Sequence, residues 1–166
     1  MKEKYIEECK IIQQNCTYTA ETHHQMANSA KRQAVWLEVV PAGLAALSGT
    51  LVSVNVLGEW ALIITVITSV ITAVSAVLNP NKTYQAHLEA AKNFTALKHD
   101  ARFMHEATAG KMSEESFAVC VEGLHNKYNE LIKTVPPTNG KSFAKAQEIV
   151  QKGTHDPDKD KEGRVK

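Results

Sequence analysis

The residue types that most often carry chemistry are present in this sequence, but their spacing matches no catalytic or metal-binding pattern. The chain has 166 residues, among them seven histidines and three cysteines. It contains no CxxC pair, no HExxH segment, no glycine-rich phosphate loop and no G-x-S-x-G turn. His23 and His24 are adjacent, so on a helix their side chains point about 100° apart. We therefore expect no catalytic residue, no metal site and no cofactor, and we expect the histidines to be solvated or to lie between helices.

The cysteines are expected to be structural. They are Cys9, Cys16 and Cys120, and their odd number argues against a disulfide framework. Because Cys9 and Cys16 lie two helical turns apart, they share one face of a helix. We predict that both are small residues of an apolar core.

A stripe of hydroxyl groups within an apolar run is the remaining chemical signal. Residues 64–80 read ITVITSVITAVSAVLNP and include no charged side chain. At about 100° per residue, the hydroxyls fall within an arc of roughly 120° and the bulky aliphatic residues fall opposite them. Alternation by two, as in a strand, separates the two sets far less well, so the pattern predicts a two-faced helix. The hydroxyl residues are Thr65, Thr68, Ser69, Thr72 and Ser75.

Two long uncharged runs predict that the chain spans a membrane. Val39–Gly58 and Trp60–Asn81 contain no charged residue, and only Glu59 separates them. Each run makes a helix of roughly 30 Å, the thickness of the hydrocarbon core of a bilayer, so we place the spans at about 36–57 and 60–79. The alternative is a buried helical pair in a soluble protein, which would need several more apolar helices to cover it. The rest of the chain is strongly polar.

Basic residues on either side of these runs predict the orientation of the spans. Lys31 and Arg32 precede the first run and Lys82 follows the second, whereas the connector between the runs has no Lys or Arg. By the positive-inside rule, both termini therefore lie in the cytoplasm. The residues expected at the membrane surfaces are Glu38, Glu59, Trp36, Trp60, Lys31, Arg32 and Lys82.

The first run has a face of small residues. Ala45, Gly49 and Ser53 lie with other small residues inside an arc of roughly 140°, and the leucines lie on the other side. Small residues allow helices to approach closely. Two interpretations stay open: the small faces of the two spans pack against each other within one hairpin, or the hydroxyl face lines a water-filled path in an oligomer.

The predicted architecture is an all-α membrane protein. A two-helix transmembrane hairpin carries long cytoplasmic N- and C-terminal helices, which form a bundle. The expected parts are an N-terminal helix over 1–34, the hairpin over 35–81, a cytoplasmic helical pair over 82–135, and a short amphipathic segment with a disordered tail over 136–166.

Local signals mark the ends of these helices. Asn79-Pro80 ends the second span, because proline lacks an N–H group and disfavours the α conformation in the residue before it. A further helix is expected over about 82–108 and is expected to end at Ala109-Gly110-Lys111. Ser113 then has the position of an N-cap for the next helix.

Two segments beside the apolar runs match the layout of a known family. They read AKRQAVW before the first run and NPNKTYQAHLEAAKNFTALKHDAR after the second. With the two runs between them, they make residues 15–135 resemble the SLATT family of bacterial two-transmembrane effector domains. The residues of the second segment that carry the resemblance are Tyr84, His87, Ala91, Phe94 and Leu97.

The resemblance implies an effector of the bacterial inner membrane in anti-phage defence or conflict signalling. Such a protein oligomerises and permeabilises the membrane, which causes growth arrest or cell death. Its partners would be the lipid bilayer, further copies of itself and a separate sensor or signalling protein. With a formal net charge of +1 and scattered basic residues, the chain has no patch for nucleic acid. The alternative is a non-conducting two-span scaffold that anchors a cytoplasmic helical interaction bundle, and an enzyme ranks third.

Overall fold

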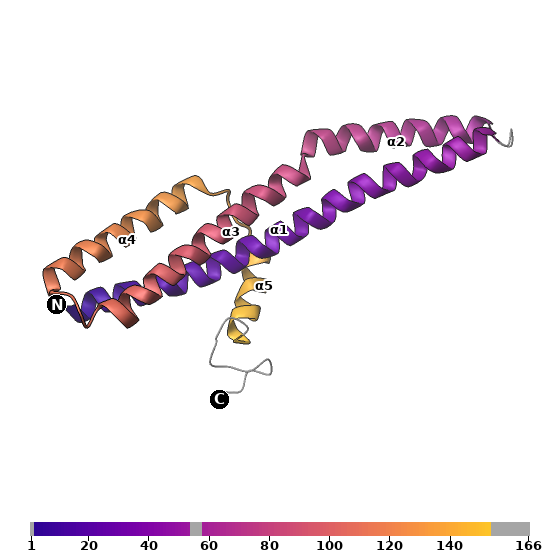
Figure 1. Ribbon diagram of the computed structural model, residues 1–166. Helices are drawn as coiled ribbons and strands as arrows, with labels where there is room; N and C mark the ends of the chain where they lie inside the picture. The colour runs from indigo at the N-terminus through magenta and orange to yellow at the C-terminus, as the bar shows by residue number, and fades with distance from the viewer. Residues whose placement is uncertain (1, 54–57, 154–166) are drawn as a thin grey trace. The chain divides into compact units, whose positions relative to one another are not determined.

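The computed structural model describes residues 2–53 and 58–153, and its regular elements are all helices. They are α1 (Lys2–Ser53), α2 (Gly58–Leu78), α3 (Pro80–Phe103), the π-helix η1 (Met104–Thr108), α4 (Glu114–Thr134) and α5 (Gly140–Gln151) (Figure 1). No strand occurs within these ranges, so the all-α fold class is confirmed. The side chains of residues 51–59 and the tail predicted to be disordered, residues 154–166, lie outside the described part.

The chain divides into two compact units. Residues 1–26 and 86–166 form the first, which we call the polar unit, and residues 27–85 form the second, which we call the apolar unit. Residues of α1 and of α3 contribute to both units.

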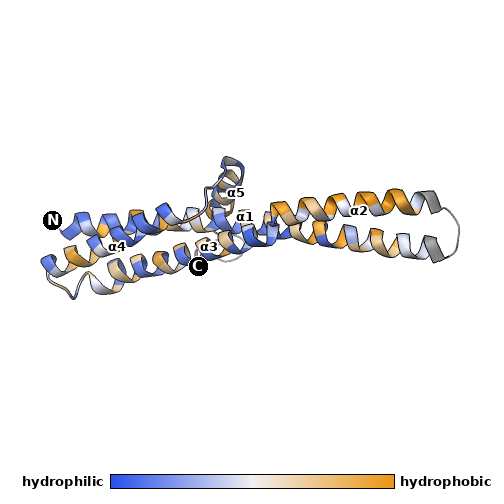
Figure 2. Ribbon diagram, turned by 90° about the horizontal axis from the view of Figure 1, so that it is seen from above, coloured by the Kyte–Doolittle hydropathy of each residue, from blue (hydrophilic) through white to orange (hydrophobic). Residues whose placement is uncertain are grey.

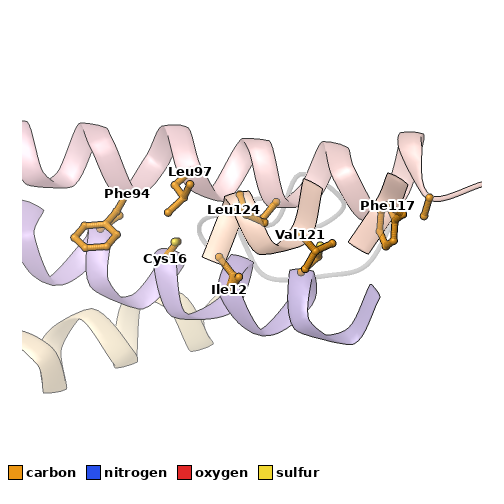
Figure 3. Close-up of a cluster of buried hydrophobic side chains, with 11 residues drawn as sticks. Ile12, Cys16, Phe94, Leu97, Phe117, Val121 and Leu124 are labelled. Atoms are coloured by element: carbon orange, nitrogen blue, oxygen red, sulfur yellow. The ribbon is translucent and has the colours of Figure 1, made fainter. Parts of the chain in front are cut away.

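Three helical segments of the polar unit pack around one apolar core. Its members recur three or four positions apart on each helix, which is the spacing of one helical face. Phe94 and Phe117 are the largest fully buried side chains. The core comprises Cys9, Ile12, Cys16, Ala20, Phe94, Leu97, Ala101, Ala109, Phe117, Val121 and Leu124 (Figure 3).

The two cysteines predicted as core residues are confirmed in that position. Cys9 and Cys16 are fully buried and free, while Cys120 is half-buried. Burial raises the pKa of the Cys9 thiol to about 11 and that of Cys16 to about 12. Both thiols therefore stay protonated at neutral pH and act as small apolar side chains.

Side-chain caps begin the last two helices. Ser113 is the N-cap of α4, as its position predicted, because its Oγ accepts a hydrogen bond of 3.3 Å from the amide of Ser116. Asn139 does the same for α5, with its Oδ1 2.8 Å from the amide of Ser142. Each cap satisfies an N–H group that has no partner inside its helix.

The end of the third helix differs from the sequence prediction of a continuous α-helix to about residue 108. From Met104 to Thr108 the helix widens into a π turn, and the amide of Ala109 donates to the carbonyl of Met104 at 3.0 Å. A π turn inserts one residue and so rotates the chain about the helix axis. The rotation places buried Ala109 in the core, where an unbroken α-helix would bring Thr108.

In the apolar unit, α2 lies beside the second half of α1 (Figures 1 and 2). The hydropathy colouring of Figure 2 shows that α2 is apolar along its length. It ends at Leu78, as the Asn79-Pro80 pair predicted. Asn79 then has a φ of 40°, a left-handed conformation that asparagine tolerates better than most residues. It is the single residue between α2 and α3.

Asn79 serves both helices. Its amide donates to the carbonyl of Ser75 at 3.0 Å, which closes the last turn of α2. Its Oδ1 accepts from the amide of Lys82 at 3.2 Å, which caps the first turn of α3. Pro80 follows at the first helical position, where its missing N–H group costs nothing.

Candidate functional site

Exposed large apolar side chains are concentrated on α2. The exposed large side chains on this helix are Leu62, Ile63, Val66, Ile67, Val70, Val74, Val77 and Leu78. The helical run Trp60–Thr108 is long and apolar enough to cross a membrane, and only 6% of its most apolar window is buried. An exposed apolar surface of this extent is unfavourable in water but matches lipid tails.

Within the described ranges, this is the one helix that meets the length and composition of a span. The predicted first span extends over residues 54–57, which lie outside those ranges.

The contact between α1 and α2 runs along one narrow stripe on each helix, which we call the seam. From Trp60 to Leu78, the side chains that are buried or half-buried recur at alternating steps of three and four residues. The seam residues are Ala34, Leu37, Val40, Pro41, Leu44 and Ser48 on α1, and Ala61, Ile64, Thr68, Ile71 and Ser75 on α2.

The seam divides the predicted hydroxyl stripe. Thr68 and Ser75 lie half-buried on the seam, whereas Thr65, Ser69 and Thr72 are exposed beside it. The centre of the hydroxyl arc is therefore rotated from the centre of the seam, by roughly 60° at 100° per residue.

Four of the five hydroxyl protons of the stripe are held by the helix itself. Thr65, Thr68, Ser69 and Thr72 each donate to the carbonyl four residues earlier, at distances between 2.8 and 2.9 Å. Because these four donors have partners, this part of the stripe can lie in an apolar environment without an unsatisfied O–H group.

The small face of the first run points away from the seam. Ala45 and Gly49 are exposed, and a Cβ built on Gly49 would meet nothing within 4 Å. Within one protomer, the contact with α2 is thus made by the seam residues and not by these small residues. The side chain of Ser53 lies outside the described residues.

The predicted membrane-surface residues gather mostly where α2 joins α3. Glu38 accepts a hydrogen bond of 2.7 Å from the Nδ2 of Asn81. The Lys31 ammonium lies 6.0 Å from the centre of the Tyr84 ring, within the range of a cation–π contact. Arg32, Trp36 and Lys82 are exposed near this junction, and Trp60 is exposed at the start of α2. The side chain of Glu59 is outside the described part.

The polar unit contains a buried histidine pair that the sequence analysis did not find. The Nδ1 atoms of His23 and His87 lie 2.9 Å apart, and His23 stacks on the ring of Phe94 with centroids 5.8 Å apart. His23 is fully buried and His87 is 4% exposed. The spacing along each helix could have indicated that these histidines are buried. His23 continues the helical stripe of Cys16 and Ala20, and His87 lies one turn before Ala91.

Burial keeps both histidines neutral. It lowers the pKa of His23 to about 4, helped by the charges of His87 and His24, and it lowers the pKa of His87 as well. A neutral pair shares one hydrogen bond when one Nδ1 carries the proton and the other accepts it. The Nε2 of His23 is buried without a partner. Among the described residues no three His, Cys, Asp or Glu side chains are grouped to hold a metal ion.

Together, the exposed apolar helix and its internally bonded hydroxyls indicate a helical membrane protein. The described surface of α2 presents lipid-compatible side chains. The comparisons with known proteins then give the family. A family model described as SMODS and SLOG-associating 2TM effector domain family 4 matches residues 3–162, so the chain belongs to this family, SLATT_4. This match confirms the resemblance drawn from the sequence.

The family is one of membrane effectors associated with defence systems and is not a known enzyme family. Searches of the curated proteins and of the solved structures found no significant match.

Proposed function

We propose that this protein is an effector that oligomerises in the bacterial inner membrane and permeabilises it during anti-phage defence or conflict signalling. The α1–α2 pair inserts as a two-span hairpin with both termini in the cytoplasm, and a separate sensor or signalling protein supplies the trigger. Permeabilisation then causes growth arrest or cell death.

The observation that carries the proposal is the position of the hydroxyl stripe beside the seam. Thr65, Ser69 and Thr72 lie on neither the contact with α1 nor the bulky aliphatic face. In a ring of protomers, this face can turn toward a shared axis while the aliphatic face meets lipid. Uncharged hydroxyls suit a wide or gated water path better than a selective filter.

The small face of α1 offers a route to such a ring. Ala45 and Gly49 are exposed, and the space beside Gly49 is open. Small residues allow the backbone of a neighbouring helix to approach closely, which favours helix association in lipid. We propose that α1 of one protomer receives a helix of the next protomer at this face.

A paired substitution tests the pore. Ser69→Leu with Thr72→Leu fills the exposed hydroxyl face with aliphatic side chains, and we expect it to abolish dye release from vesicles and loss of membrane potential in induced cells. The matched control is Val70→Leu with Val74→Leu, which enlarges exposed side chains on the opposite, aliphatic face. The control should leak like the unmodified chain.

Two results would refute the proposal. One is vesicles that stay intact with densely reconstituted protein, with and without the cognate trigger. The other is equal leakage from the hydroxyl-face variant and its control. Either result would favour the non-conducting scaffold, in which the hairpin anchors a cytoplasmic helical interaction bundle.

A further inference from the structure

A groove of about 670 Å³ lies in the apolar unit, between α1 and the junction of α2 with α3. The residues of its wall that bear on its chemistry are Ser29, Arg32, Trp36, Leu37, Leu78 and Thr83. All of them belong to the apolar unit, residues 27–85.

The two ends of the groove differ in chemistry. Leu37 and Leu78 line one end, and Leu78 is 61% exposed at the end of the apolar surface of α2. Ser29, Arg32 and Thr83 line the other end. From Ser29 to Leu37, α1 rises about 12 Å at 1.5 Å per residue, which is enough to cross the headgroup layer of one leaflet, roughly 5–8 Å thick.

The polar end has an excess of positive charge. Within the described ranges, no ion pair or hydrogen bond holds the Arg32 guanidinium. Lys31 lies over the Tyr84 ring, and the carboxylate of Glu38 is bonded to the amide of Asn81. Lys82 is also exposed beside the junction. An anion in this groove would meet a free guanidinium and two hydroxyl-bearing side chains.

We propose that the groove binds one anionic phospholipid. The Arg32 guanidinium binds the headgroup phosphate, the Ser29 and Thr83 hydroxyls donate to its oxygens, and an acyl chain leaves past Leu37 and Leu78 onto the surface of α2. The groove is large enough for a headgroup and glycerol, and it is too small to enclose both chains. The proposal rests on the proposed function only in requiring that α2 lies in a bilayer.

The apolar end favours a lipid over a soluble anion. A free phosphate would use the cationic end alone and leave Leu37, Leu78 and the Trp36 ring in water, which is unfavourable. A phospholipid matches both ends of the groove. Its charged headgroup and its hydrocarbon chain are joined in one molecule, with the same spacing as the polar and apolar ends of the groove. Basic pockets beside membrane helices on the cytoplasmic side are a recurring site for anionic headgroups.

Tryptophan fluorescence can measure lipid binding in the groove. Trp36 lines the groove and Trp60 lies at the start of α2, so Trp60→Phe leaves a single fluorophore in the groove. The full chain with this change is reconstituted in vesicles that contain brominated phosphatidylglycerol or brominated phosphatidylcholine. We expect stronger quenching of Trp36 by the brominated anionic lipid at equal bromine content.

Two charge variants test the role of Arg32. In the Trp60→Phe chain, Arg32→Gln should lower the preference for the anionic lipid about tenfold. The variant loses the positive charge that favours a headgroup of net negative charge over phosphatidylcholine, in which the choline cation offsets the phosphate. Lys31→Gln is the matched control, because it removes the same charge from the adjacent residue, which does not line the groove. The control should keep most of the preference.

Three outcomes would overturn the proposal: equal quenching by both lipids, an equal loss in the two charge variants, or recovery of Trp36 emission on addition of millimolar inorganic phosphate. The last would reassign the groove to a soluble anion. Dye release plays no part in this assay, so a chain that inserts without leaking refutes the pore and leaves the lipid site standing. A chain that fails to float with vesicles refutes both.

Discussion

The buried pair of His23 and His87 makes the polar unit sensitive to acid. Burial and the neighbouring histidines lower the pKa of His23 from its ordinary value of 6.5 to about 4 in the folded protein. In the unfolded chain the imidazole takes up its proton near the ordinary value, so below that pH the unfolded state binds more protons. The stabilisation is complete above about pH 6.5 and is lost progressively as the pH falls toward 4.

The size of this effect follows from the two pKa values of His23. Between about pH 7.5 and pH 5, the linkage relation predicts that the free energy of unfolding, or opening, of the polar unit falls by about 2 kcal/mol. The equilibrium constant for opening rises roughly 30-fold. The pKa of about 4 already includes the repulsion from His87 and His24, so their effect is part of this figure. The Phe94 ring, which stacks on His23, offers no compensating charge.

Hydrogen–deuterium exchange of the full chain in detergent or nanodiscs measures this opening. Exchange of peptides from the early part of α1 and from α3 is compared at the two pH values, after correction for the intrinsic pH dependence of exchange. We expect the roughly 30-fold loss of protection in the unmodified chain. In His23→Phe the ring contact with Phe94 is kept and this titrating group is removed, so the loss should shrink to the part contributed by His87, whose pKa burial also lowers.

A solvent-exposed histidine of the chain provides the matched control. His99 is exposed on α3, so His99→Gln should keep the full pH dependence. A change in protection of less than about threefold in the unmodified chain would show that burial of His23 does not resist protonation. An equal flattening of the pH dependence in both variants would show that His23 is not the group responsible.

Two further predictions concern the junction and the thiols. Asn79→Ala should destabilise the α2–α3 junction by about 1–2 kcal/mol, because it loses both the tolerance of a positive φ and the cap of α3, whereas Asn79→Gly should cost less because it keeps the backbone conformation. Amide exchange of Pro80-flanking peptides measures this, and equal effects of the two substitutions would contradict it. Iodoacetamide at neutral pH should label Cys120 but neither Cys9 nor Cys16 until denaturant is added. The reason is that burial holds the pKa of the Cys9 and Cys16 thiols at about 11 and about 12. Mass spectrometry would contradict the burial of Cys16 if it found this residue labelled in the native protein.

Features set by neighbouring residues were predicted correctly from the sequence. The helical period of residues 64–80, the stop at Asn79-Pro80 and the cap at Ser113 each depend on contacts within a few residues. The core positions of Cys9 and Cys16 also followed from spacing alone, because one helical face was otherwise apolar.

Features that need a partner helix were not predicted. The hydroxyl stripe could be assigned to one side of α2, but the edge of the seam falls between Thr68, which lies on it, and Thr72, which does not. The position of this edge depends on how α1 and α2 fit together. The His23–His87 contact joins residues far apart in the chain, so the spacing along each helix could indicate burial of each histidine but not its partner. The π turn at Met104 has no local sequence signal, and its effect, the placement of Ala109 in the core, is visible only with the packed helices.

The hydrogen bonds within the hydroxyl stripe have a consequence for the ions that the stripe would favour. Four of its hydroxyls donate their only proton to a backbone carbonyl. On their outward side they therefore present oxygen lone pairs alone. Such a surface is negative in local potential although it has no formal charge. Cations and the hydrogen atoms of water find partners there, whereas chloride finds no donor. A wide path lined by this stripe would therefore bias the passage of ions toward cations, without a single ionised side chain and without a selective filter.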